Sequence, residues 1–118
     1  MKKNFRMAAK LLLVATAFAM MAAAEDGMGV FYSDYFHGKN TADGGVYDKE
    51  GLTAAHKTLK FGTKVKITNP ETNQSVVVTI TDRMPPRNRN IIDMTRRAAR
   101  EIGIEKQGRA KVNIEVQP

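Results

Sequence analysis

Apolar and polar residues alternate in three short runs of the chain. Their apolar members are Val65 and Ile67, then Val76, Val78 and Ile80, and finally Val112, Ile114 and Val116. A period of two places alternate side chains on one face of a strand, so each run predicts a half-buried strand. Residues 69–74 separate the first two runs, and their Asn and Pro residues favour a turn, which predicts a hairpin. A further strand is expected from Gly29 to Tyr32.

One helix is predicted between Thr95 and Gly103. The Thr95 hydroxyl can accept a hydrogen bond from a free amide of the first turn, and Ala98, Ala99 and Ile102 form an apolar stripe. Several short strands with one short helix predict a mainly β fold. A small closed or nearly closed barrel is expected, because closure removes the edges that short strands would otherwise expose.

The first 24 residues have the pattern of a signal peptide. Basic residues at the start precede an apolar stretch from Met7 to Met21, and three alanines follow at 22–24. The apolar stretch is short for a membrane span. We therefore expect cleavage after Ala24, a folded domain of residues 25–118, and a periplasmic or secreted protein without a stable membrane anchor. An uncleaved N-terminal anchor is the alternative.

Composition and charge restrict the possible functions. The 118 residues are 42% hydrophobic and 26% charged, which describes one small domain. The absence of cysteine excludes disulfides, thiolate metal sites and a cysteine nucleophile. The formal charge is +7, but the leader carries four of the 19 basic residues and no acid, so the remaining chain has a charge of +3. This small surplus and the expected export disfavour nucleic acid as a partner.

Asp82 and His56 are the candidate catalytic residues. Asp82 directly follows the run 76–80, and strand parity places its side chain with the buried valines, where partial burial favours the protonated carboxyl that a general acid needs. Pairing with the adjacent Arg83 would favour the charged form. A structural ion pair or a turn cap is the alternative role of Asp82, and a packing histidine is the alternative role of His56. The only other histidine, His37, shares no spacing motif with it, so we expect neither a metal nor a cofactor.

Two further features point to a polymer in the cell envelope. An aromatic cluster comprises Phe31, Tyr32, Tyr35 and Phe36. We expect at least two of these rings to pack in the core or at its rim, and the others to stack on sugar rings. The stretch 83–100 contains six arginines and only one acid, Asp93. It is either a solvated face or a surface that attracts anionic wall polymers, whose carboxylates suit the arginine fork.

Several segments together resemble a known family. Residues 36–44 read FHGKNTADG, residues 52–59 read LTAAHKTL, residues 81–83 read TDR with Pro85 two positions on, and residues 91–96 read IIDMTR. Tyr47-Asp48 and the FGT sequence at 61–63 lie between these segments. In the order and spacing of all these segments, the chain from about Gly29 to Val116 is similar to the catalytic domain of the rare lipoprotein A family. The members of this family are septal lytic transglycosylases.

The resemblance implies a fold and an activity. The fold is a six-stranded double-psi β-barrel, and the activity is cleavage of peptidoglycan glycan strands, preferably stripped of stem peptides, to 1,6-anhydro products. It implies that Asp82 is the acid/base and that His56 lies beside it. A single carboxyl can suffice, because the sugar's own 6-hydroxyl replaces water as nucleophile. Substrate contacts are expected from Tyr32, Tyr47, Thr53, Lys57, Arg83 and Arg87, and partners from the divisome or the cell wall.

The chain also departs from the family pattern. Gly45 occupies the position eleven residues before His56 where the family usually carries a glutamate, and Phe31 replaces the usual tryptophan. We also expect neither the lipidation cysteine nor the C-terminal glycan-binding repeat domain of the family. Gly45 favours a second hypothesis, a non-catalytic double-psi barrel that binds peptidoglycan or acts as a secreted inhibitor or an expansin-like module. His56 and Asp82 together favour catalysis.

Overall fold

The alternating runs form the wall of a closed six-stranded barrel. The computed structural model describes residues 24–118, so the predicted signal peptide lies, except for Ala24, outside the described residues. In chain order the elements are β1 (Ala24–Phe31), η1 (Asp34–Phe36), β2 (Thr53–His56), β3 (Lys64–Thr68), β4 (Ser75–Arg83), β5 (Ile92–Met94), α2 (Arg96–Glu101) and β6 (Arg109–Val116). The mainly β class, the six strands and the short helix confirm the predicted fold.

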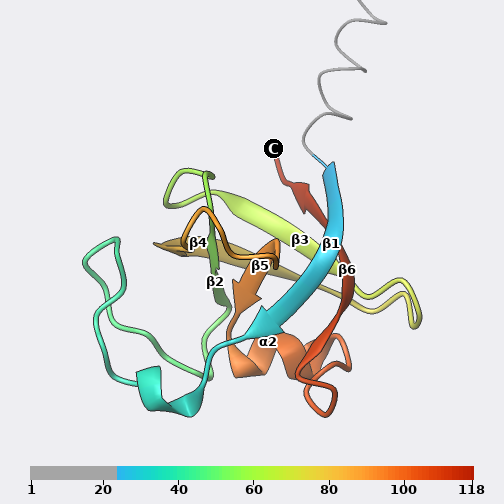
Figure 1. Cartoon of the computed structure of the whole chain (residues 1–118), viewed down its shortest axis with the longest axis horizontal. Coiled ribbons are helices and arrows are strands. Elements are labelled where there is room, and N and C mark those ends of the chain that lie inside the picture. The colour runs from blue at the N-terminus through green and yellow to red at the C-terminus, as the bar shows by residue number, and fades with distance from the viewer. Residues whose placement is uncertain (1–23) are drawn as a thin grey trace, which may run out of the picture.

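The strands close in the order β1-β5-β2-β4-β3-β6, and β6 returns to β1 (Figure 1). Two neighbouring pairs are parallel, β1 with β5 and β2 with β4, and the other pairs are antiparallel. Closure leaves no long unpaired edge, which is the physical advantage that short strands gain from a barrel. It also brings β5, β2 and β4 side by side, although they come from distant parts of the chain.

The barrel interior is filled by the inward-facing members of the predicted runs and by the helix. The fully or almost fully buried core residues include Val65, Ile67, Val78, Ile80, Ile92, Met94, Val112 and Ile114 from the strands, and Ala98, Ala99, Ile102 and Ile104 from the helix and the turn after it. The Thr95 hydroxyl accepts a hydrogen bond from the Ala98 amide and donates one to the Gly51 carbonyl, which fixes the start of α2 as predicted. The helix packs against β4 and β1.

The hairpin of β3 and β4 is confirmed, and two strands were not foreseen. Val65 pairs with Val78 and Ile67 with Val76, and residues 69–74 form the turn. The strands β2 and β5 have only four and three residues, which is too few for a periodic pattern to predict them. Both are central to the site described below.

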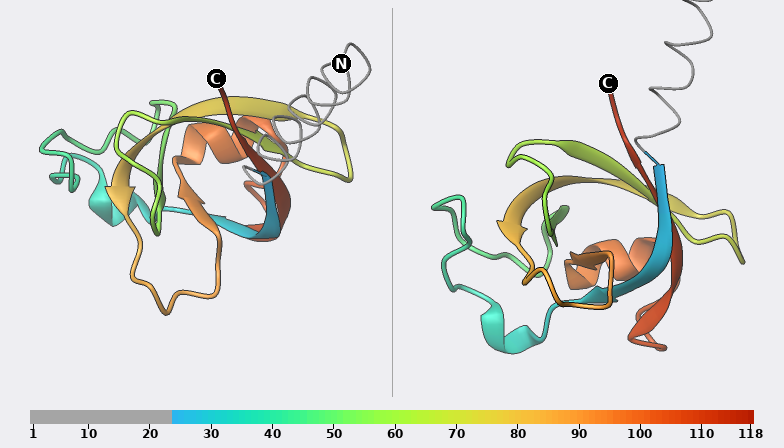
Figure 2. Two further views of the ribbon diagram at one scale, coloured as in Figure 1. Left: turned by 90° about the horizontal axis from the view of Figure 1, so that it is seen from above. Right: turned by 45° about the horizontal axis from the view of Figure 1, so that its top comes forward.

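Two long connections lie outside the barrel wall. The segment from residue 32 to residue 52 leaves the end of β1, forms η1 and a long loop, and returns to β2, and Figure 1 shows it in cyan to green beside the barrel. The connection between β4 and β5, residues 84–91, projects from the barrel as a loop in the left view of Figure 2. No helix within residues 24–118 has the length and apolar character needed to cross a membrane.

Candidate active site

The site is organised around Ala55 on β2. Ala55 pairs with Asp93 of β5 on one side and with Asp82 of β4 on the other, so two carboxyl-bearing residues flank it at one level of the sheet. The pairing of β2 with β4 shifts by one residue between Ala54 and Ala55, because Ala54 pairs with Ile80 and Ala55 with Asp82. Such a bulge re-aims the side chains that follow it. The regular alternation that predicts Asp82 on the side of the valines therefore ends just before Asp82.

Three donors converge on the Asp82 carboxylate. The Tyr32 hydroxyl donates to Oδ2 at 2.8 Å, and the backbone amides of Ala42 and Arg83 donate to Oδ1 at 3.0 and 2.9 Å. Tyr32 directly follows β1, and Ala42 lies in the long loop between β1 and β2. Asp82 therefore connects three distant parts of the chain. A carboxylate with three directed donors is held in one orientation. Asp82 is half-buried, so the carboxylate remains within reach of solvent.

Tyr32 and Tyr47 form an aromatic stack behind Asp82. Their ring centroids are 4.4 Å apart with an interplanar angle of 22°. Burial and the hydrogen bond to Asp82 raise the pKa of Tyr32 far above its ordinary value. Burial also raises the pKa of Tyr47, whose side chain is almost fully enclosed. The nearby Arg96 backbone lowers this pKa and offsets part of the effect. Both phenols therefore stay protonated, and Tyr32 donates its proton in the hydrogen bond to Asp82.

Asp93 is the second carboxyl of the site. It lies between Ile92 and Met94, which face the core, and its Oδ1 is buried without a hydrogen-bond partner. Burial, and to a smaller extent the neighbouring charge of Asp82, raise the pKa of Asp93 from 3.8 to about 7. Near neutral pH a large fraction of Asp93 carries a proton, whereas Asp82 is surrounded by donors. Two carboxyls in such different environments can take opposite roles in proton transfer, one as the donor and the other as the acceptor.

The loop that supplies the Ala42 amide is stabilised by Asp43. The Asp43 carboxylate accepts hydrogen bonds from the Thr41 hydroxyl and the Gly45 amide, and these bonds lower the pKa of Asp43. The Asp43 amide donates to the Thr81 carbonyl, which docks the loop next to Asp82. A Cβ atom at Gly45 would lie 3.2 Å from Asp43 Oδ1, so the Asp43 carboxylate closes over this position. The Asp43 side chain thus shapes this edge of the site, because position 45 is a glycine and has no side chain.

His56 follows Ala55 at the end of β2 and contacts the start of β1. Its Nδ1 accepts hydrogen bonds from the amides of Thr58 and Leu59, both at 3.1 Å, which leaves the proton on Nε2 facing Glu25 Oε1 at 3.3 Å. His56 pairs with Arg83, one register step beyond the pair of Ala55 and Asp82. Its ring is buried and fixes the end of β2 to the start of β1. No hydrogen bond or ion pair between His56 and Asp82 is found in residues 24–118.

The other predicted substrate residues are spread around the two carboxyls. Thr53 begins β2, is half-buried, and accepts the Thr95 amide through its carbonyl. Lys57 is half-buried and follows directly after β2. Arg83 donates to the His56 carbonyl at 3.0 Å and lies 4.6 Å from the centre of the Phe61 ring. Arg87 is exposed on the loop between β4 and β5. The structure joins Tyr32 to Asp82 and stacks Tyr47 on Tyr32, whereas Arg83 contacts the His56 carbonyl.

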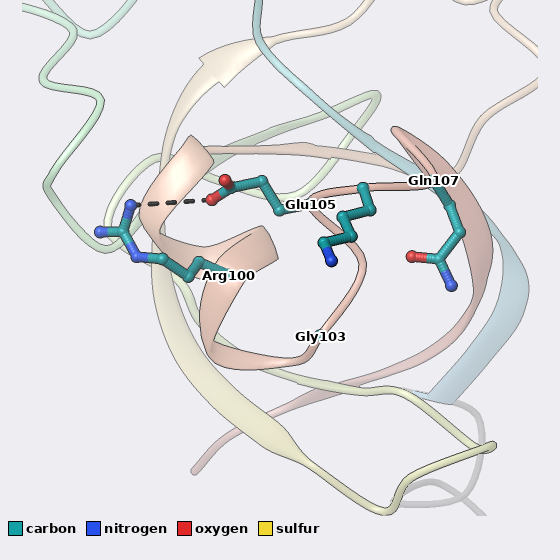
Figure 3. Close-up of a pocket in the computed structure, with 5 residues that line it drawn as sticks. Arg100, Gly103, Glu105 and Gln107 are labelled. Carbon is teal, nitrogen blue, oxygen red and sulfur yellow. Dashed lines mark ion pairs between the residues drawn. The ribbon is translucent and has the colours of Figure 1, made fainter.

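A surface pocket of about 420 Å³ lies apart from the carboxyl cluster, which consists of Asp82 and Asp93 with Tyr32 and Tyr47. It is lined by Arg100, Gly103, Glu105, Lys106 and Gln107, at the end of α2 and the start of the connection to β6 (Figure 3). Arg100 and Glu105 form an ion pair of 3.7 Å at one side of it, and Lys106 is its other charged lining residue. Within residues 24–118 no group of three or more His, Cys, Asp or Glu side chains is arranged to hold a metal ion. The carboxyl cluster is therefore the better candidate for chemistry.

Asp93 and the Ala42 amide belong to the site but are not predicted from the sequence. Asp93 had one usable signal, an acid between two apolar residues in a run where all other charges are basic. Because β5 is only three residues long, that signal could not be distinguished from a loop. The Ala42 amide has no side-chain signal at all, since its role depends on how the loop docks.

The chain resembles known proteins over most of its length. The family model described as "Lytic transglycolase" matches residues 24–114. A probable endolytic peptidoglycan transglycosylase RlpA of Synechocystis is 43% identical over 100 residues, which cover 85% of this chain and 31% of that protein. The endolytic peptidoglycan transglycosylase RlpA of Rickettsia bellii is 46% identical over 94 residues, which cover 77% of this chain and 41% of that protein. The chain thus spans between about a third and two fifths of the length of these curated relatives.

Solved structures with little sequence similarity share the fold. The Streptomyces papain inhibitor superimposes with a TM-score of 0.65 at 16% identity and covers 80% of this chain and 94% of that chain. A mutant of the Clavibacter michiganensis expansin in complex with cellohexaose gives a TM-score of 0.63 at 17% identity and covers 80% of this chain and 50% of that chain. These likenesses confirm the double-psi barrel.

Proposed function

Because the chain belongs to the lytic transglycolase family, we propose that it cleaves the glycan strands of peptidoglycan and leaves 1,6-anhydro ends. The observation that carries this proposal is the pair of carboxyls level with Ala55, one buried with a raised pKa and one surrounded by donors. Strands stripped of stem peptides are the preferred substrate. The apolar leader supports export, so that the protein meets its substrate in the periplasm or outside the cell.

The two carboxyls divide the proton transfers of the reaction. Protonated Asp93 gives its proton to the glycosidic oxygen as the bond between that oxygen and the anomeric carbon breaks. Asp82 accepts the proton of the sugar's 6-hydroxyl as the hydroxyl oxygen bonds to the same carbon. One proton enters and one leaves the substrate, and the product is an anhydro sugar without addition of water. Transfer of the proton from Asp82 back to Asp93 restores the starting state.

This assignment differs from the sequence prediction, which gave both proton transfers to Asp82, because it moves the role of the acid to Asp93. A single carboxyl is sufficient in principle, but Asp93 is adjacent and carries a proton near neutral pH because of its burial. Tyr32 keeps the Asp82 carboxylate oriented through the 2.8 Å hydrogen bond, so Asp82 faces the substrate as an acceptor. His56 acts as a positioning residue, because it fixes the end of β2 next to Ala55.

Substrate binding is assigned to the residues around the carboxyls. We assign contacts with the glycan strand to Tyr32, Thr53 and Lys57, and contacts with carboxylates of the wall polymer to Arg83 and Arg87. The exposed guanidinium groups suit an anionic polymer better than a neutral one. Proteins of the divisome or of the cell wall are the expected partners.

The proposal is tested by incubating the purified protein with intact and with amidase-stripped peptidoglycan and analysing the products by mass spectrometry. Products with 1,6-anhydro ends are expected, in higher yield from the stripped strands. Asp82→Asn and Asp93→Asn should each lower the rate by at least about a hundredfold with the fold retained, the usual scale for loss of acid/base catalysis. Glu71→Gln, an equivalent change in the exposed turn between β3 and β4, should have no effect. Full activity of either Asn variant would exclude the assigned role.

Gly45 favours a second candidate function, binding of peptidoglycan without cleavage. The position has no side chain, and the Asp43 carboxylate occupies the adjacent space. The same incubation distinguishes the two functions. Sedimentation of the protein with the insoluble wall in the absence of anhydro products would support binding alone.

A further inference from the structure

We propose that Tyr47 is a positioning residue whose buried hydroxyl serves Asp93 as Tyr32 serves Asp82. The inference rests on the proposed function for its consequence in catalysis, but the interaction itself can be measured without any substrate. It gives Tyr47 a different role from the one that the sequence suggests, because a side chain that is 3% exposed leaves little ring surface for a sugar.

The Tyr47 ring is held rigidly in place. One face stacks on Tyr32, and the His37 ring contacts it edge-on at a centroid distance of 6.5 Å. Its backbone is fixed on both sides, because the Tyr47 amide donates to the Lys39 carbonyl at 2.8 Å and its carbonyl accepts the Gly38 amide at 2.9 Å. The hydroxyl therefore has one location, set by the loop and by the stack.

Two buried polar atoms in this cluster have no hydrogen-bond partner. They are the Tyr47 hydroxyl and Asp93 Oδ1, and the one other such side-chain atom in the described residues belongs to Glu105, in the pocket at the end of α2. A buried polar group without a partner is costly, so native proteins usually satisfy such groups directly or through a water molecule. The Tyr47 hydroxyl is a donor and Asp93 Oδ1 is an acceptor. The two atoms are not hydrogen-bonded to each other in the structure, so one bridging water or a small rotation of the Asp93 side chain would satisfy both.

Electrostatics supports the same pairing. The charge of Asp93 raises the pKa of Tyr47 further than burial alone, so the two groups lie within interaction range. The charged or titratable groups around Asp93 are Asp82 from β4, Tyr32 after β1, Tyr47 from the long loop, and Arg96, which lies close to Tyr47. Among these, Tyr47 is the donor without an assigned acceptor, since Tyr32 is bonded to Asp82.

The consequence is a donor that acts when Asp93 becomes charged. The Tyr47 hydroxyl keeps its proton, so it can only donate. Its interaction with Asp93 is weak while Asp93 is protonated and strong after Asp93 has passed its proton to the leaving oxygen. Interactions that strengthen during the reaction accelerate it, whereas those of equal strength throughout do not. The stacked tyrosines thus hold one carboxyl each, and the stack keeps the two carboxyls in a fixed relation.

The experiment is a carboxyl ¹³C NMR titration of the full protein labelled at aspartate, with the Asp93 signal assigned by its loss in Asp93→Asn. In Tyr47→Phe, which keeps the ring and its stack, the Asp93 midpoint should rise by about one pH unit, because a donor to the charged form has been removed. Tyr35→Phe, a matched change at an exposed ring, should leave the midpoint unchanged. An unchanged or lower midpoint in folded Tyr47→Phe would overturn the inference.

The pH profile of cleavage gives the second measurement. In Tyr47→Phe the maximal rate should fall about tenfold or more with little change in KM, and the alkaline limb should move to higher pH together with the NMR midpoint. A purely structural role would lower the melting temperature and leave both midpoints in place. If the wild-type protein yields no anhydro product, the proposed function fails, but the NMR shift still decides the interaction between Tyr47 and Asp93.

Discussion

Replacement of Asp93 by Asn should stabilise the folded protein at pH 8 and have a much smaller effect at pH 4. In the folded state burial raises the pKa of Asp93 from 3.8 to about 7. The folded state therefore binds this proton more tightly than the unfolded state does. The free energy of unfolding contains a favourable contribution below pH 4, and this contribution is lost as the pH rises from about 4 through 7.

The size of the effect follows from the displacement of the pKa. One pH unit corresponds to ~1.4 kcal/mol, so the change from 3.8 to about 7 amounts to about 4 kcal/mol between the two ends of this range. This is a large part of the total stability of a domain, which is typically roughly 5 to 15 kcal/mol. The asparagine side chain does not titrate, so the variant lacks this dependence on pH.

The assay is urea denaturation of the wild type and Asp93→Asn at pH values from 4 to 8. Other titrating groups contribute equally to both proteins, and the difference between the two pH profiles isolates Asp93. Asp82→Asn provides a second check, because the Asp82 charge contributes to the raised pKa of Asp93 and its loss should flatten the profile. Parallel profiles for the wild type and Asp93→Asn would refute the reasoning and show that Asp93 is solvated like an ordinary surface acid.

Three further predictions concern the scaffold and the basic loop. His56→Ala should lower the free energy of unfolding in urea by about 1 to 3 kcal/mol, because two backbone amides lose their acceptor. Glu25→Gln should change the free energy of unfolding by less than about 1 kcal/mol, because Glu25 is half exposed. Equal effects of the two changes would contradict this assignment. Thr95→Ala should cost about 1 to 2 kcal/mol in the same assay, because α2 loses its cap and the Gly51 carbonyl its donor, and a neutral result would show that the cap is dispensable. Reversal of charge at Arg87 and Arg89 should weaken sedimentation with isolated peptidoglycan and reduce its salt dependence, and an unchanged salt profile would identify these arginines as a solvated face.

Periodicity predicted those parts of the fold that form long or capped elements. The alternation of Val76, Val78 and Ile80 gave β4, and Thr95 gave the helix start, because each depends on residues near one another in sequence. The strands β2 and β5 are specified by their place between longer neighbours, so their own sequences carry no period. The barrel order brings them together through contacts between residues far apart in the chain.

The candidate site likewise combines features that local sequence predicts with features that depend on distant contacts. Asp82 was found because it ends a clear strand, but its surroundings depend on a register shift in β2 and β4 that no local pattern announces. Asp93 acquires its properties from burial by other elements, and Tyr47 acquires a place in the site only when the long loop folds back. His56 was selected from its neighbours in sequence, and its partner Glu25 lies 31 positions away. Which residues meet is decided by the closed barrel, and single-sequence patterns do not encode that.

The dependence of kcat/KM on pH, measured by release of anhydro products from stripped glycan strands, tests the central claim most directly. If the buried carboxyl of Asp93 donates the proton, the rate should fall above a midpoint of about pH 7 as this group ionises. A rate that stays constant from pH 6 to about pH 9 would contradict the account, because Asp93 loses its proton within that range.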